Sequence, residues 1–168
     1  MRAPTSLFIG RFQPFHKGHL KALQYIAARS SCVLIVIGSA QASYEPKNPF
    51  TSAERKRMIR AELLEAGLAK KCRLCELDDI NDDERWVAHV DAHIPRYDVC
   101  YSNNQLVLRL MRSAGKKTAG VPFFRKTEYN ATRIRGRIKK GEKWGDRVPR
   151  AVRERMEKLK AEERIRRL

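Results

Sequence analysis

The chain is short of acidic residues, of cysteine and of long apolar runs, and each shortage argues against a class of protein. Only 19 of its 168 residues are Asp or Glu, against 36 Lys and Arg, so the formal net charge is +17. The longest apolar run, Cys32–Ile37, is far too short to cross a bilayer. Residues 1–10 contain one basic residue and no apolar stretch of sufficient length, so we expect no signal peptide. We therefore expect a soluble, cytoplasmic protein.

Four cysteines in a chain of this length do not form a disulfide scaffold. Cys32 and Cys100 lie in predicted buried strands, where a thiol is usually a small core residue. Cys72 and Cys75 form a single CxxC with no second pair, which argues against a zinc site. The acidic cluster does not have the spacing of a calcium loop and is expected to be solvated; it comprises Asp78, Asp79, Asp82, Asp83 and Glu84. The sequence thus predicts no metal site on the protein.

The positive charge is concentrated toward the C-terminus, with 17 basic and 7 acidic residues from Arg125 onward. Such a charge suits anionic partners, either nucleic acid or small phosphorylated metabolites, without specifying a fold. Nucleic-acid binding is favoured by aromatic residues among the basic ones, and Trp144 is the sole aromatic near the helix expected from Pro149. We interpret that helix as a solvated face with pairs such as Glu154 and Lys158.

Strand and helix patterns alternate along the chain. Apolar, β-branched runs predict strands at Thr5–Gly10, Cys32–Ile37, Cys72–Leu77, Asp98–Tyr101 and Lys117–Val121. Helix starts are marked by Lys17, by a capping box of Thr51 and Glu54, by a second one of Ser102 and Gln105, by Asn130 and by Pro149. This alternation predicts an α/β fold: a doubly wound (Rossmann-like) parallel sheet of five to six strands, with helices on both faces and a basic C-terminal helix. The length fits a single domain over residues 1–168, helical from about residue 130.

The most informative stretch is Leu7–His19, with the sequence LFIGRFQPFHKGH. It predicts a buried strand, a sharp turn at Gly10 and a helix that begins near Lys17. A helix start presents unpaired N–H groups and a positive dipole end to an anion. Ligands of such sheets bind beyond the carboxyl ends of the strands, where Gly10, Gly38 and Ser102 all lie. We therefore expect the loops after these residues to share one crevice.

The side chains of this loop suit phosphate. Arg11 carries a fixed charge in a fork geometry that matches phosphate oxygens. His16 and His19, three residues apart, share one side of the first helical turn, and Gly18 between them leaves room for a ligand. A single histidine would be interpreted as a surface residue of a turn. One arginine, two histidines and two glycines together at a sheet edge favour a phosphate site.

Together with later segments, GRFQPFHKGH resembles the HxGH-type nucleotidyltransferases and, more narrowly, the nicotinamide mononucleotide (NMN) adenylyltransferases of archaeal type. The other matching segments, in the family's order, are Gly38–Gln41, Asn48–Arg55, Tyr101–Asn104 and Asn130–Arg135. They cover the chain almost end to end. Asn130 stands where the family usually has Ser, and Asn caps a helix equally well, so the helix start is expected to be kept. A direct bond from a Ser hydroxyl to phosphate, if the family uses one, is not expected at Asn130.

The resemblance implies transfer of the adenylyl group of ATP to NMN, which gives NAD and pyrophosphate. Direct attack of the NMN phosphate on the α-phosphorus needs alignment and charge neutralisation more than a protein nucleophile. We assign catalytic roles on the ATP phosphates to Arg11, His16 and His19, and a role at the pyrophosphate to Arg135. Further ATP-binding residues are predicted to be Gly10, Phe12, Gly18, Ser102, Asn103, Thr132 and Ile134.

The acceptor residues are predicted from the same resemblance. Judged without the resemblance, Trp86 would be interpreted as a core residue. The resemblance instead favours stacking of its ring on the cationic nicotinamide. Asp79 and Asn81 are expected to bind the amide or the ribose, and Lys47 the NMN phosphate. Mg²⁺ is expected to bind with ATP, held by phosphates and water.

Two alternatives stay open. A sister enzyme would use the same transfer chemistry on phosphopantetheine or flavin mononucleotide (FMN), although Trp86 and the Asn48–Thr51 and Ser102–Asn104 segments favour NMN. A basic nucleic-acid-binding protein without transferase activity is the alternative from another class, and salt-sensitive duplex binding would indicate it. The resemblance also implies a homo-oligomer, such as a hexamer, with no membrane partner.

Overall fold

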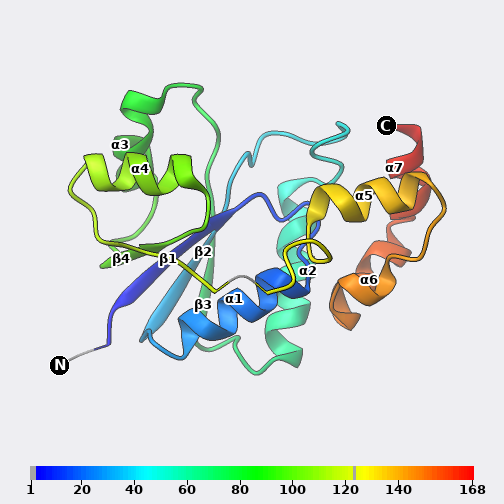
Figure 1. Ribbon diagram of the computed structural model, residues 1–168, viewed down its shortest axis with the longest axis horizontal. Coiled ribbons are helices and arrows are strands. Elements are labelled where there is room, and N and C mark those ends of the chain that lie inside the picture. The colour runs from blue at the N-terminus through cyan, green and yellow to red at the C-terminus, as the bar shows by residue number, and fades with distance from the viewer. Residues whose placement is uncertain (1–2, 123) are drawn as a thin grey trace.

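The computed structural model describes residues 3–122 and 124–168, and its centre is a parallel sheet (Figure 1). Five strands of the described residues lie in the order β3-β2-β1-β4-β5, and every neighbouring pair is parallel. Their bounds are β1 Thr5–Gly10, β2 Cys32–Ile37, β3 Cys72–Glu76, β4 Val99–Tyr101 and β5 Thr118–Ala119. The chain reverses its direction of travel across the sheet between β1 and β4, which is where α/β sheets bind ligands.

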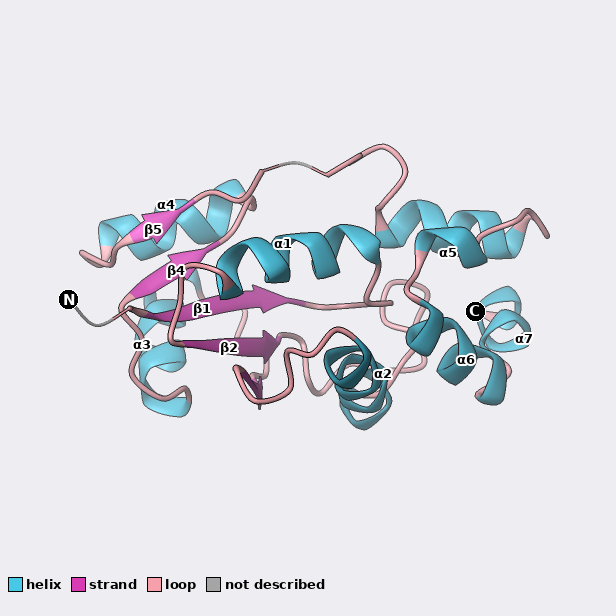
Figure 2. Ribbon diagram, turned by 90° about the horizontal axis from the view of Figure 1, so that it is seen from below, coloured by secondary structure: helices cyan, strands magenta, loops and turns pink. Residues whose placement is uncertain are grey.

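The helices of the described residues cover both faces of the sheet (Figures 1 and 2). α3 and α4 lie on one face, and α1 and α2 lie on the other, where α5, α6 and α7 extend the layer beyond α2. The bounds are α1 Lys17–Ala27, α2 Ser52–Glu65, α3 Asp83–His93, α4 Gln105–Ser113, α5 Ala131–Lys139, α6 Arg150–Lys158 and α7 Ala161–Arg167. The predicted doubly wound α/β fold is thus confirmed. None of these helices is long and apolar enough to span a membrane.

The apolar run in β2 is continuous because both of its faces are buried. Val33, Ile35 and Ile37 belong to the core on the α1 and α2 side, and Leu34 and Val36 to the core under α3 and α4. All five side chains are at most 2% exposed. A strand that is covered on both faces has no reason to alternate apolar with polar residues.

Two predictions about helix starts and ends are wrong. Ser102 and Gln105 form no capping box; Asn104 caps α4 and accepts from the N–H of Leu106 at 3.0 Å, and the Ser102 hydroxyl accepts from the N–H of Asn104 at 3.0 Å. The expected single helix from Pro149 is divided into α6 and α7, because Lys160 takes a left-handed conformation with a φ of 50°.

The division of the last helix turns α7 back onto the molecule. Ala161 and Ile165 are each 1% exposed in the core. Arg164 donates to both carboxylate oxygens of Glu54, at 2.7 and 3.0 Å. Glu54 is also the residue that caps α2 by accepting from the N–H of Thr51 at 2.9 Å. The C-terminal helix therefore stabilises the start of α2, and the Thr51–Glu54 capping box is confirmed.

Glu62 of α2, a helix that packs on α6, is 5% exposed. Its Oε2 has no hydrogen-bond partner among the described residues. Burial, with a smaller contribution from Glu65, raises the pKa of Glu62 from 4.5 to about 7. The folded protein therefore binds a proton more tightly than the unfolded chain, so this group destabilises the fold as pH rises from about 4.5 through 7.

Replacing Glu62 by Gln should remove that pH dependence. We expect the free energy of unfolding of the wild type to fall by about 1–2 kcal/mol more than that of E62Q between pH 5 and pH 8. Urea unfolding at several pH values measures this difference, and E84Q, at an exposed position of α3 away from Glu62, is the control. Parallel stability curves for the wild type and E62Q would refute the assignment.

Candidate active site

Two adjoining pockets lie beyond the carboxyl ends of the strands and share Ile9, Gly10 and Asn104. The first, called here the histidine pocket, has a volume of about 290 Å³ and is lined by His16, Gly18, His19, Ser102, Asn103 and described residues that follow β5, among others. The second, called the Trp86 pocket, has a volume of about 310 Å³ and is lined by Arg11, Ser39, Asp79, Asn81, Trp86 and Leu110, among others. The end of β1 thus forms a common wall between two spaces.

The histidine pocket is built on the start of α1. His16 is the N-cap, its Nδ1 accepts from the N–H of His19 at 3.3 Å, and the Nδ1 of His19 accepts from the N–H of His16 at 3.2 Å. The two rings stack with their centroids 3.5 Å apart. The pair is therefore a reciprocal cap made of two imidazoles, in place of the usual Ser and Glu.

This reciprocal cap fixes the protonation of both rings. Because each Nδ1 accepts a hydrogen bond, the proton of each neutral ring is on Nε2, which is left as a donor. Burial lowers the pKa of His16 to about 4, and burial followed by the charge of His16 lowers the pKa of His19 well below its ordinary value of 6.5. At neutral pH the two histidines are uncharged hydrogen-bond donors.

An NMR titration can test these charge states directly. The ring resonances of His16 and His19 should keep the shifts of neutral imidazole from pH 8 down to about pH 5, because the folded pKa of His16 is about 4 and that of His19 is also depressed. Both should show the Nε2-protonated tautomer in ¹⁵N spectra. Ring resonances that titrate with a midpoint near 6.5 would contradict the cap.

Two glycines leave room around this cap. A Cβ on Gly18 would lie 3.0 Å from the Cβ of Tyr129 and 3.1 Å from two ring atoms of His16. A Cβ on Gly10 would lie 3.0 Å from two ring atoms of Phe12. Gly10 is thus required by the packing of Phe12 beneath the loop, in addition to any approach of a ligand.

The loop that follows β5 supplies residues that sequence reasoning missed. Phe124, Lys126 and Tyr129 line the histidine pocket. The Nζ of Lys21 lies 5.9 Å from the ring centroid of Phe124 and 5.7 Å from that of Tyr129, within cation–π range. Their position could have been inferred from the order of elements, because this loop begins at the same edge of the sheet as the loop between β1 and α1.

The Trp86 pocket is shaped by contacts between two loops. The Ser39 hydroxyl donates to a carboxylate oxygen of Asp79 at 2.5 Å. The Gln41 amide binds both backbone groups of Asp79, at 3.2 Å to the carbonyl and 3.1 Å from the N–H. The Gly38–Gln41 segment therefore holds Asp79 in place.

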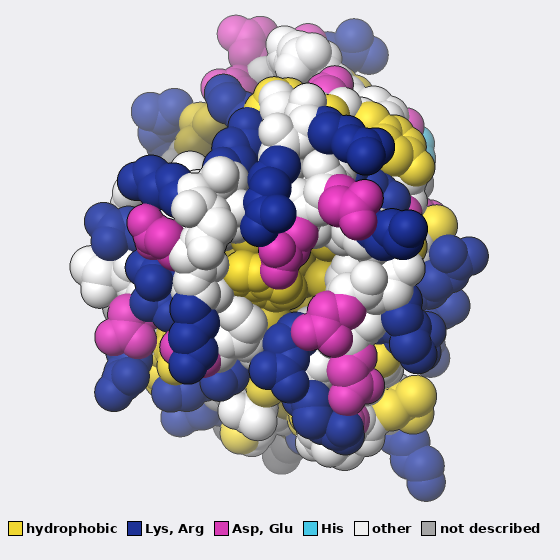
Figure 3. Space-filling view, turned by 90° about the vertical axis from the view of Figure 1, so that its right-hand side faces the viewer, with side chains coloured by type: hydrophobic (Ala, Val, Ile, Leu, Met, Phe, Trp, Pro, Cys, Tyr) yellow, Lys and Arg dark blue, Asp and Glu magenta, His cyan; other side chains and the backbone are white. Residues whose placement is uncertain are grey.

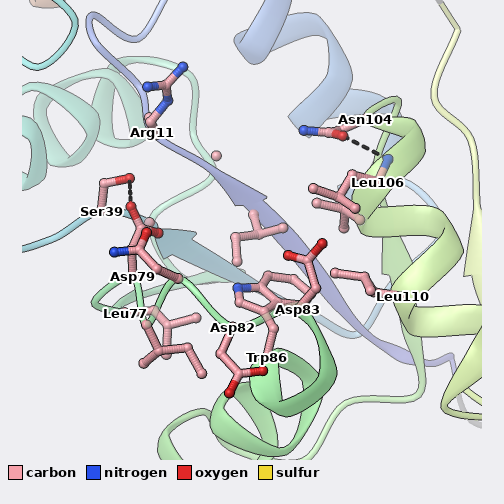
Figure 4. A pocket seen from close by; sticks show the side chains of 16 residues that line it. Arg11, Ser39, Leu77, Asp79, Asp82, Asp83, Trp86, Asn104, Leu106 and Leu110 are labelled. Carbon is pink, nitrogen blue, oxygen red and sulfur yellow. Dashed lines mark hydrogen bonds between the residues drawn. The ribbon is translucent and has the colours of Figure 1, made fainter.

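Trp86 lies in the first part of α3 and is half-buried. Figure 4 shows its ring between the Ser39–Asp79 pair and the side chains of Leu106 and Leu110, with Arg11 at the rim. Of the described lining residues, three are acidic, namely Asp79, Asp82 and Asp83, and Arg11 is the one basic residue. The pocket combines an aromatic face with negative charge, which suits a planar cation.

Five predicted site residues lie outside both pockets. Among the described residues, the following five do not line either pocket: Phe12, Lys47, Thr132, Ile134 and Arg135. Phe12 and Ile134 are 2% and 0% exposed in the core, so they can reach a ligand only through their backbone. The roles assigned to Lys47, Thr132 and Arg135 stay predictions.

Arg135 has a different environment from the one expected. Its guanidinium donates to the carbonyls of Gln13 and Pro46, at 2.8 and 3.1 Å, and to the Thr132 hydroxyl at 3.4 Å. It is 8% exposed, and burial lowers its pKa. In this structure Arg135 links the loop between β1 and α1 (the histidine loop) to the loop between β2 and α2 that contains Pro46 (the Pro46 loop). Any contact with a phosphate would use its remaining N–H groups.

The described residues contain no group of three or more His, Cys, Asp or Glu placed to hold a metal ion. Cys72 packs on the α1 and α2 side of the sheet and Cys75 on the opposite side, so the CxxC is not a pair. Burial raises the pKa of Cys72 to about 11, as expected for an unreactive thiol.

Two pockets of nucleotide size meet at the end of one strand, and one of them is lined by hydrogen-bond donors that suit phosphate oxygens. This arrangement indicates an enzyme that moves a nucleotidyl group between two substrates. A family model described as cytidylyltransferase-like matches residues 7–137. Nicotinamide-nucleotide adenylyltransferases from Pyrococcus abyssi and Pyrococcus furiosus are each 46% identical, over 162 and 164 residues, which is 96% of this chain and 87% of each relative. The chain belongs to the cytidylyltransferase-like nucleotidyltransferases and, among them, to the family of these archaeal adenylyltransferases.

A solved structure supports the fold. A bifunctional NMN adenylyltransferase/ADP ribose pyrophosphatase from Francisella tularensis, complexed with AMP and a Mn ion, superposes with a TM-score of 0.78 and 24% identity. The match covers 97% of this chain and 52% of that one, so the chain spans about half the length of the bifunctional protein.

Proposed function

We propose that the protein transfers the adenylyl group of ATP to NMN, giving NAD and pyrophosphate. The observation that carries this proposal is the wall that the two pockets share at Ile9 and Gly10. With ATP in the histidine pocket and NMN in the Trp86 pocket, the α-phosphate and the acceptor phosphate meet beside Gly10 and Arg11. The names of the archaeal relatives support the same substrates.

The proposed chemistry is a direct displacement. An oxygen of the NMN 5′-phosphate forms a bond to the α-phosphorus of ATP, the bond from that phosphorus to the bridging oxygen breaks, and pyrophosphate leaves with the electron pair. The Nε2–H groups of His16 and His19 donate to phosphate oxygens, and the exposed guanidinium of Arg11 neutralises developing charge. The start of α1 adds the positive end of its dipole. No protein nucleophile takes part.

The acceptor is held by the Trp86 pocket. We propose that the Trp86 ring stacks on the nicotinamide, whose pyridinium charge suits the nearby carboxylates. Asp79, fixed by Ser39 and Gln41, and Asn81 bind the amide or ribose hydroxyls. Lys47 is exposed on the Pro46 loop and is proposed to meet the acceptor phosphate.

A divalent cation, Mg²⁺, is proposed to bind with ATP. The protein offers no ligand set for it among the described residues, so phosphate oxygens and water would hold it. Bound there, it supplies positive charge to the leaving pyrophosphate. A homo-oligomer, such as a hexamer, is part of the same proposal and can be measured by sedimentation.

The basic C-terminal surface does not favour nucleic acid as a second function. On the face toward α5, α6 and α7, acidic side chains are interspersed among the basic ones (Figure 3). Glu154 pairs with Arg150 at 2.9 Å, so the expected pair of Glu154 with Lys158 is not the one that forms. Further pairs one helical turn apart are Arg153–Glu157, Arg166–Glu162 and Arg167–Glu163. These contacts fit a solvated face.

An acceptor comparison tests the proposed function. The protein is incubated with ATP and Mg²⁺ together with NMN, phosphopantetheine or FMN, and pyrophosphate release is measured. We expect release with NMN, roughly 100-fold or more above the other two acceptors, since their groups leave the polar contacts of the Trp86 pocket unpaired. Preference for another acceptor, or no release with any of them, would refute the proposal.

A further inference from the structure

Arg55 of α2 is 0% exposed and is held by backbone carbonyls. Its Nη1 donates to the carbonyls of Arg11 and Gly38, at 2.9 and 2.8 Å, and its Nη2 to the carbonyl of Ser39 at 3.0 Å. Its Nε donates to the carbonyl of Thr51 at 3.3 Å. Burial lowers the pKa of Arg55 to about 10, so the group is still charged at neutral pH. Among the described residues no carboxylate lies within ion-pair distance of Arg55, although the more distant charges of Glu76 and Asp79 act to raise its pKa.

A buried charge without an ion pair is costly, so its position calls for an explanation. The carbonyls that it binds belong to the loops after β1 and β2, and Arg11, Gly38 and Ser39 all line the Trp86 pocket. Arg11 is the cation at the junction with the histidine pocket, and Ser39 is the residue that orients Asp79. One guanidinium therefore connects the loop beside the donor phosphates to the loop that shapes the acceptor pocket.

We propose that Arg55 is a positioning residue for the transfer: it fixes the separation between the Arg11 loop and the Ser39 loop, and so the approach of acceptor to donor. This inference rests on the proposed function. Arg55 touches no substrate; it acts through Arg11 and Ser39. A planar fork can bind carbonyls of two loops at once, which a single ammonium on a flexible chain cannot do with the same geometry.

Arg55→Lys and Arg55→Met test this role. We expect kcat to fall roughly 10- to 100-fold, because displacement of reacting groups by about 1 Å has effects of that size, while KM for ATP and for NMN changes by about threefold or less. R55K should recover part of the kcat that R55M loses. The control is Arg166→Lys, whose wild-type guanidinium also binds a backbone carbonyl, that of Ile138 at 3.1 Å, but away from both pockets. R166K should keep the wild-type kcat.

Folded R55K and R55M proteins with a kcat within about threefold of the wild type would overturn the inference. So would a loss that appears entirely in KM. NAD formation by the wild type is measured in parallel: its absence refutes the proposed function, whereas wild-type activity that the Arg55 variants retain refutes only the positioning role.

A second measurement covers variants that do not fold. In wild-type protein with ¹⁵N-labelled arginine, the Nη–H resonance of Arg55 should shift when NMN binds and when a non-reactive ATP analogue binds, because the Nη groups donate to the two connected loops and each ligand contacts one of them. The shift depends on ligand binding and not on turnover. A resonance that neither ligand moves would overturn the inference.

Discussion

Replacing His19 by Ala is expected to lower kcat roughly 10²–10³-fold, the usual effect of removing one preorganised donor to a developing oxyanion. The variant loses the Nε2–H of a ring that lines the histidine pocket. It also loses the Nδ1 that accepts from the N–H of His16, so the capping residue is less firmly held. Loss of such a cap destabilises a helix by about 1 kcal/mol, and the packing of the ring against Phe12 and Phe15 is lost as well, so turnover is compared on folded H19A protein.

Steady-state kinetics and thermal unfolding of H19A together check this result. His93→Ala is the matched control, because His93 is an exposed histidine near the end of α3 and is not among the described residues that line the two pockets. H93A should retain wild-type turnover. A folded H19A protein with near-normal kcat would remove His19 from the mechanism.

Replacing Trp86 by Ala should weaken NMN binding roughly 10- to 100-fold, since stacking of a nucleobase-like ring on an aromatic side chain contributes about 1–3 kcal/mol. ATP binding should stay within about threefold of the wild type, because Trp86 lines the acceptor pocket and not the histidine pocket. Trp86→Phe, which keeps an aromatic face, should recover much of the lost affinity.

Calorimetric titration of the two nucleotides into W86A and W86F separates these effects. Unchanged NMN affinity in W86A would show that Trp86 lines the pocket without stacking on the nicotinamide ring. Equal losses for NMN and ATP would mean that the substitution disturbs the sheet edge as a whole.

The fold could be predicted largely because its signals are local. The continuous apolar run of β2 indicates a strand buried on both faces, and Thr51 with Glu54 marks the start of α2. The end of α6 could not be predicted, because residues 159–161 contain no glycine or proline; Lys160 turns there so that α7 can bury Ile165 and bring Arg164 to Glu54. That is a tertiary effect with no local signal.

The candidate site was predictable where one short stretch holds several groups. The histidine loop contains its own cap and its own donors, so its chemistry is visible in sequence. Arg55 and Arg135 are different, because each binds carbonyls of loops that are distant in the chain, such as Arg11 for Arg55 and Gln13 for Arg135. The sequence does not show which backbone carbonyls of these loops need a hydrogen-bond donor, because that depends on how the loops pack together in the folded protein.

Simultaneous binding of the two nucleotides is the most direct test of a transfer between two pockets that meet at Gly10. An ATP analogue with a methylene group between the α- and β-phosphorus is titrated calorimetrically into the protein, with and without saturating NMN. Binding of one analogue per chain in both titrations, with an affinity that NMN leaves unchanged or increases, is the predicted result. Displacement of the analogue by NMN would show that the two compete for one space, and would contradict the assignment of donor and acceptor to separate pockets.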